Sequence, residues 1–88
     1  MSRQDIITAL RNAPKHRFGT GRVYLVDLAA ELGCSVKAAW QAAWSEGVYS
    51  QRHDLNAAVS GSWLAESEVT DRFENEYHYV DTRLVKGY

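Results

Sequence analysis

Five apolar residues between positions 36 and 44 constrain this chain most, because they fall on one face of an α-helix. They lie at i, i+3, i+4, i+7 and i+8 as Val36, Ala39, Trp40, Ala43 and Trp44. This spacing is the full pattern of an amphipathic helix. Ser35 stands at the N-cap position and Gly47 follows the last apolar residue. We therefore predict a helix over residues 36–46.

The stretch before this helix predicts three further elements. "SRQDIITALRNAP" has helical spacing over residues 3–13, a Ser2–Asp5 capping arrangement and a terminating Pro14. "RVYLV" is rich in β-formers and predicts a strand over 22–26. "LAAEL" predicts a short helix over 28–32, with Asp27 as its N-cap and Gly33 in the left-handed conformation that ends it.

The second half predicts a hairpin and one more helix. "VYSQRH" and "VSGSWL" are candidate strands joined by a turn at "DLNAA". Val69, Phe73 and Tyr77 then recur every four residues and predict a helix over 64–76. The end of the chain, 77–88, predicts a strand followed by an extended or frayed tail. Eighty-eight residues suit a single domain, 1–88.

"LAAELGCS" resembles the second helix and turn of winged helix-turn-helix DNA-binding domains. Members of that superfamily commonly show Leu-Ala, then Leu-Gly-x-Ser, and then a recognition helix closed by Gly. Those positions are Leu28-Ala29, Leu32-Gly33-Cys34-Ser35 and Gly47-Val48 here, over about residues 24–53. The resemblance implies an α+β winged helix-turn-helix fold in the order helix, strand, helix, helix, hairpin, with an additional C-terminal helix and strand. The helix over 36–46 is about one turn shorter than the usual pattern.

In this superfamily the third helix lies in the major groove, so its outer face would contact bases. That face carries Lys37, Ala38, Gln41, Ala42 and Ser45. Gln pairs with adenine and Lys donates to guanine, although a plain solvated helix face has the same composition. Phosphate contacts are expected from Ser35 and the first amides of the helix, and from Lys15, Arg17, Arg22, Arg52 and His53.

The three tryptophans allow two interpretations. Trp40 and Trp44 lie on the apolar stripe, which favours the core, while the alternative is an exposed aromatic patch for a partner. Trp63 fits either the core or an interface. Cys34 takes a turn position that is usually apolar, and we expect a small buried side chain there.

Composition argues against several classes of protein. The single cysteine allows no internal disulfide and no multi-cysteine zinc site. The three histidines lack helical i, i+3 or i+4 partners, and no catalytic motif is present. We therefore expect no enzyme, no catalytic residue, no metal and no cofactor. No apolar run reaches the roughly 20 residues needed to span a bilayer, so we expect a cytoplasmic protein with no membrane contact.

Charge is distributed unevenly along the chain. Residues 1–53 carry seven Lys/Arg and four Asp/Glu, a balance of +3, whereas 54–88 carry three and seven, a balance of −4. This polarity suits a basic face toward double-stranded DNA, although ordinary surface variation also produces it.

Two hypotheses follow. The first is a small DNA-binding regulatory or accessory protein, expected by analogy to act as a homodimer. The second is an inhibitor or adaptor on a winged-helix scaffold, which contacts a protein partner through its acidic C-terminal segment.

Overall fold

The first helix confirms its sequence signals. In the computed structural model, which describes residues 1–15, 21–53 and 62–88, α1 spans Arg3–Asn12. Ser2 and Asp5 form a complete capping box, in which each side chain accepts the other residue's amide. The helix stops at Ala13, directly before the proline.

The second helix begins earlier than the sequence predicts. Strand β1 is Arg22–Tyr24, and α2 follows at once as Leu25–Leu32. The prediction that Asp27 is the N-cap is wrong, because Asp27 lies inside the first turn and is buried. The first free amides of α2 are satisfied by distant groups instead. Leu25 N–H donates to the His78 carbonyl at 2.9 Å, and Val26 N–H donates to Ser67 Oγ at 3.1 Å.

The turn into the third helix forms as the sequence predicts. Gly33 has φ +69° and closes α2 in the left-handed conformation. Ser35 caps α3, Val36–Ser45, and its Oγ accepts the Ala38 amide at 3.1 Å. Glu46 ends α3, and Gly47 follows with φ +76°.

Two small antiparallel sheets accompany the helices. Strand β4, Tyr79–Asp81, pairs with β1 in the register Arg22↔Asp81, Val23↔Val80 and Tyr24↔Tyr79. Gln51 makes an isolated antiparallel bridge to Tyr79 on the other side of β4. The second sheet is a hairpin of β2, Val69–Thr70, and β3, Glu76–Tyr77.

The order of elements after α3 differs from the prediction. Only Gln51 of the first predicted hairpin strand pairs, and the predicted turn at 54–58 lies outside the described residues. The described part of the predicted return strand is helical, as the start of α4, Ser62–Ser67. The single helix predicted over 64–76 is therefore wrong, since α4 ends at Ser67 and the β2–β3 hairpin follows.

A side chain explains why a hairpin replaces that helix. The Asp71 carboxylate accepts the amides of Phe73 at 2.8 Å and Asn75 at 3.0 Å, which fixes a tight turn. Glu74 completes the turn with φ +67°. The four-residue spacing of Val69, Phe73 and Tyr77 imitates a helix, but the local Asp71 bonds favour the turn.

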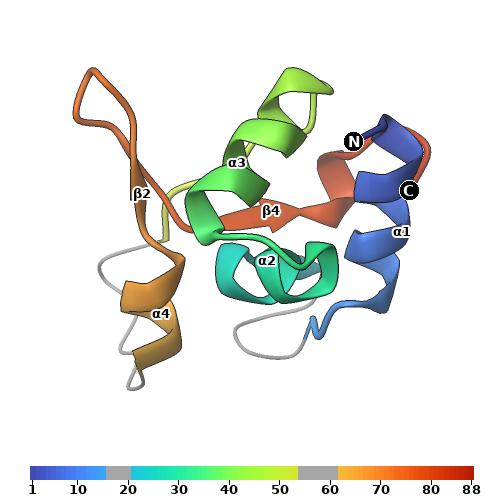
Figure 1. Cartoon of the computed structure of the whole chain (residues 1–88), viewed down its shortest axis with the longest axis horizontal. Helices are drawn as coiled ribbons and strands as arrows, with labels where there is room; N and C mark the ends of the chain where they lie inside the picture. Colours follow the sequence, from blue (N-terminus) through green and yellow to red (C-terminus); the bar gives the residue numbers. More distant parts are fainter. Residues whose placement is uncertain (16–20, 54–61) are drawn as a thin grey trace.

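The core lies where α1, α2 and α3 meet β1 and β4. Its fully buried side chains include Ile6, Leu10, Val23, Leu25, Leu28, Ala39, Ala43, Val48 and Val80. Figure 1 shows α1 on one side of α3 and the β2–β3 hairpin projecting on the other side.

The last residues pack against α1 rather than extending away from the domain. After β4, a 3-10 turn spans Thr82–Leu84, and both the amide and the hydroxyl of Thr82 donate to the Gly21 carbonyl at 2.7 Å. The Arg11 guanidinium donates to the carbonyls of Gly87 and Tyr88. The last residues of the chain consequently lie beside α1 (Figure 1).

Candidate nucleic-acid interface

The outer face of α3 presents a line of polar side chains to solvent. Lys37, Gln41 and Ser45 are exposed, one turn apart along the helix. The two alanines between them, Ala38 and Ala42, are only partly buried. Ala39 and Ala43 on the opposite face are fully buried. The structure therefore brings the predicted base-contacting residues together on one accessible surface.

The tryptophans of α3 divide between the two interpretations. Trp40 is half-buried and packs against the core, whereas Trp44 is 37% exposed. The prediction that Trp44 belongs to the core is wrong. At 100° per residue, position 44 is turned 80° from position 36, so its ring leaves the side that α1 and α2 cover.

Trp44 instead joins an aromatic cluster on the surface. Its ring meets Tyr49 edge to face at 4.7 Å and Tyr77 at 5.1 Å. Trp40 stacks on Tyr77 at 5.6 Å, so the cluster ties α3 to β3. Tyr49 remains 56% exposed, which extends the apolar surface beyond the helix.

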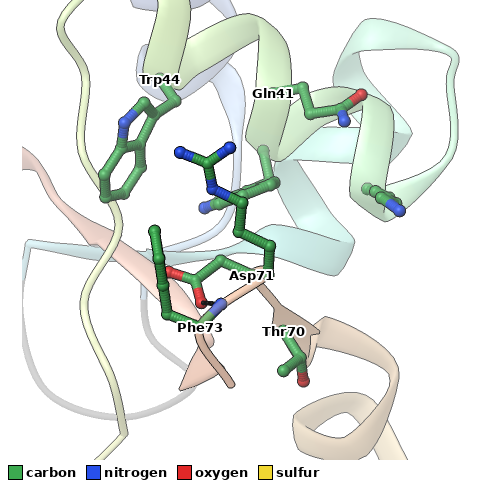
Figure 2. A pocket seen from close by; sticks show the side chains of 8 residues that line it. Gln41, Trp44, Thr70, Asp71 and Phe73 are labelled. Carbon is green, nitrogen blue, oxygen red and sulfur yellow. Dashed lines mark hydrogen bonds between the residues drawn. The ribbon is translucent and has the colours of Figure 1, made fainter. Parts of the chain in front are cut away.

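A groove separates α3 from the turn of the β2–β3 hairpin. Its volume is about 430 Å³, and its walls are Lys37, Trp40, Gln41, Trp44, Thr70, Asp71, Arg72 and Phe73. Figure 2 shows Trp44 above and Phe73 below the same opening, with Gln41 at its side. Phe73 is 69% exposed, so the groove carries an accessible ring on each wall.

The charges around this groove are mainly cationic toward solvent. Desolvation acts to raise the pKa of Asp71, but hydrogen bonds from Asn75, Phe73 and Tyr77 outweigh it and hold that pKa below its ordinary 3.8. The carboxylate is therefore ionised, and its oxygens are occupied inside the turn. The Arg72 guanidinium lies 4.8 Å from the centre of the Phe73 ring. Within the described part of the chain, neither Lys37 nor Arg72 forms an ion pair.

The other predicted phosphate-contacting cations among the described residues already have partners in the fold. Lys15 Nζ donates to the carbonyls of Arg11 at 2.8 Å and Ala13 at 3.1 Å. Arg22 lies 4.4 Å over the Tyr79 ring. Arg52 is exposed but stands 3.7 Å from the Glu76 carboxylate. Arg17 lies outside the described residues.

The predicted DNA contact of His53 is wrong, because its side chain is buried. The sequence predicts a phosphate contact from His53, but its side chain is 2% exposed. Its Nδ1 lies 2.9 Å from the Tyr24 hydroxyl, and its amide donates to Nδ1 of His78 at 3.1 Å. His53 is therefore an interior residue that links β1 to the start of β4.

One cluster of acidic and imidazole groups has the proximity of a metal site. Candidate ligand atoms of Glu68, Glu76 and His78 lie within 4.8 Å of one another. His78 Nδ1, however, accepts the His53 amide, so the neutral ring carries its proton on Nε2. A metal ion at Nε2 would have to displace that proton. Metal-bound histidines usually donate a hydrogen bond from their other ring nitrogen, but Nδ1 of His78 accepts one instead. Burial lowers the pKa of His78 despite the two glutamates, which keeps the ring neutral.

Sequence reasoning missed the hairpin wall of the groove. The helix predicted over 64–76 would include Thr70, Arg72 and Phe73, whereas the structure places them in the β2–β3 hairpin. The available signal was "DRFEN", in which Asp71 and Asn75 bracket a turn.

Comparison of this chain with protein-family models, curated proteins and solved structures yields no match. None of the helices in the described residues is long and apolar enough to cross a membrane. The fold and site define a small α+β domain with a solvent-facing helix beside an aromatic groove.

Proposed function

We propose that this protein binds double-stranded DNA with α3 in the major groove, as a small regulatory or accessory factor. The observation that carries the proposal is the exposed line of Lys37, Gln41 and Ser45 on the second helix of a two-helix motif. The tight turn at Gly33 and the Ser35 cap are the local features that this motif requires. A major groove about 12 Å wide admits such a helix.

The strand order supports a winged helix-turn-helix as the scaffold. Strand β1, between α1 and α2, pairs with β4, and β4 also bridges to Gln51 just after α3. In this interpretation the wing is the connection from Gln51 to β4. It is an enlarged wing, since it includes α4 and the β2–β3 hairpin.

The chemistry of the α3 face fits a short DNA contact. The Gln41 amide can pair with adenine N6 and N7, and Lys37 can donate to guanine. Ala38 and Ala42 let the backbone approach the base edges, while the Ser35 end of the helix presents amides to a phosphate. Ten residues rise about 15 Å, so one helix covers few base pairs. We therefore infer that DNA is bound by a homodimer on paired half-sites.

The test is selection from a randomised duplex library, followed by anisotropy titration of the selected sequence. A Lys37→Ala/Gln41→Ala variant should lose the sequence preference of the native protein while keeping its circular dichroism. The matched control is Gln4→Ala/Lys86→Ala, which removes the same two side-chain types from exposed positions on α1 and near the C-terminus. Equal preference in the native and Lys37→Ala/Gln41→Ala proteins would show that α3 is not the contact surface.

A second candidate is a protein-interaction module, and the exposed aromatic surface favours it. Tyr49 and Phe73 are 56% and 69% exposed, and such side chains are common anchors at protein interfaces. The acidic C-terminal segment would then supply further contacts to the partner. This candidate replaces the first if no duplex is bound even at about 50 mM salt.

A further inference from the structure

The groove between α3 and the hairpin, called the slot below, has one aromatic ring on each wall. Trp44 comes from the helix and Phe73 from the turn, and both point toward the opening (Figure 2). The Trp44 indole is held by Tyr49 and Tyr77, which meet it edge to face. A ring anchored in this way gives a flat ligand a preformed wall.

The remaining groups around the slot match the parts of a nucleotide. Lys37 stands on the α3 wall and Arg72 on the hairpin wall, and each offers a cation to a phosphate. The Gln41 amide and the Thr70 hydroxyl can hydrogen-bond to the edge of a base. Aromatic faces with nearby cations are the usual means of holding unpaired bases.

We propose that this groove takes one unpaired nucleobase of DNA between the walls that carry Trp44 and Phe73. The flanking phosphates would lie at Lys37 and at Arg72, whose guanidinium would leave its 4.8 Å contact with the Phe73 ring for the phosphate. The proposal rests on the proposed DNA binding and adds a preference for DNA that contains an unpaired base. An apolar side chain of a protein partner would use the two rings alone. It would leave both cations and the Gln41 amide without a counterpart, so the nucleotide accounts for more of the site.

The same edge of α3 serves both modes of binding. Lys37 and Gln41 line the slot and also belong to the outward face of the helix. A bulged base beside a helix-contacted major groove therefore lies within reach of the slot. The protein should bind a bulged duplex more tightly than the intact duplex of the same sequence.

The experiment compares a matched duplex, the same duplex with one extra unpaired thymine, and a thymine 15-mer. Anisotropy gives the affinities and quenching of tryptophan fluorescence reports stacking. The native protein should prefer the bulged over the matched duplex by about fivefold or more. Phe73→Ala and Phe73→Leu should abolish this preference, whereas Phe73→Tyr, which keeps a ring, should retain it. Leu84→Ala is the control, since Leu84 is 70% exposed and outside the groove.

Each result has a separate meaning for the two proposals. Equal affinity for bulged and matched duplexes overturns the slot and leaves duplex binding standing. A preference that survives Phe73→Leu also overturns it, because stacking is then not the cause. Absence of binding to all three DNAs overturns both proposals. Phe73-dependent binding of a capped acidic peptide with one phenylalanine would then assign the groove to a protein partner.

Discussion

The salt dependence of DNA binding can be worked out from the cations that remain available. On the surface formed by α3 and the hairpin, Lys37 and Arg72 have no ion pair among the described residues. Arg52 adds a third cation if DNA displaces its 3.7 Å contact with Glu76. Two to three phosphate contacts give a slope of log affinity against log salt of about −1.8 to −2.7 for one protomer.

This slope predicts a modest loss of affinity. Between about 50 and 200 mM salt, binding of one protomer should weaken roughly ten- to fortyfold. The assay is an anisotropy titration of one duplex at five salt concentrations, with sedimentation to count protomers per DNA. Lys37→Ala should reduce the slope by about one, whereas Lys86→Ala should leave it unchanged. A slope steeper than about −5 per protomer would refute the inference that the other cations of the described residues are occupied within the fold.

Two further predictions concern the fold. Gly33→Ala should destabilise the domain by about 1–2 kcal/mol in urea unfolding, because φ is +69° there and a side chain is strained in that conformation, although no atom lies within 4 Å of an added Cβ. Gly33→Asn should destabilise it less. If both variants were as stable as the native protein, the backbone argument would be refuted. Burial lowers the pKa of His78 below its ordinary 6.5; Glu68 and Glu76 act to raise this pKa, whereas His53 and Arg52 act to lower it. The stability that the neutral His78 ring contributes is therefore fully present above pH 6.5 and is lost as the pH falls below that value. The free energy of unfolding should therefore fall between about pH 7 and 5. It should fall less in His78→Asn, which retains an acceptor for the His53 amide. The carboxylates with a lowered pKa titrate below 3.8, which is outside this pH range.

Local signals in the sequence were sufficient for α1, α3 and the turn between α2 and α3. Each depends on neighbours within a few residues: the Ser2–Asp5 capping box, the Ser35 cap, and the freedom of Gly33 to adopt a left-handed conformation. Because the outer face of α3 follows from helical periodicity, the exposure of Lys37 and Gln41 could also be predicted.

The elements that depend on distant partners could not be predicted in this way. The start of α2 is fixed by the His78 carbonyl and by Ser67 Oγ, which lie about forty to fifty positions further along the chain. The hairpin depends on Asp71, whose carboxylate accepts hydrogen bonds from the amides of Phe73 and Asn75. The apolar residues around this turn have helical spacing, so the sequence pattern predicts a helix there instead. The groove requires both α3 and this hairpin, so no stretch of sequence contains it.

Several of the cations that make residues 1–53 positive bind carbonyl groups within the fold, which a count of charges does not reveal. Arg3 donates to the carbonyls of Glu46 and Lys86, and Arg11 and Lys15 likewise bind main-chain carbonyls. Arg3 and Arg11 thereby fasten the end of α3 and the C-terminal residues to α1, which is a structural use of their charge. Lys37 is left as the exposed cation of α3.

Binding by such a surface must then depend on geometry more than on charge. With few unpaired cations among its described residues, this surface gains little from nonspecific attraction to phosphates, which supplies most nonspecific affinity. Its discrimination would come from Gln41 and Lys37 at base edges and from the rings of Trp44 and Phe73. Removing one of these side chains should therefore change which DNA is bound, while removing Arg52 should change affinity alike for every sequence.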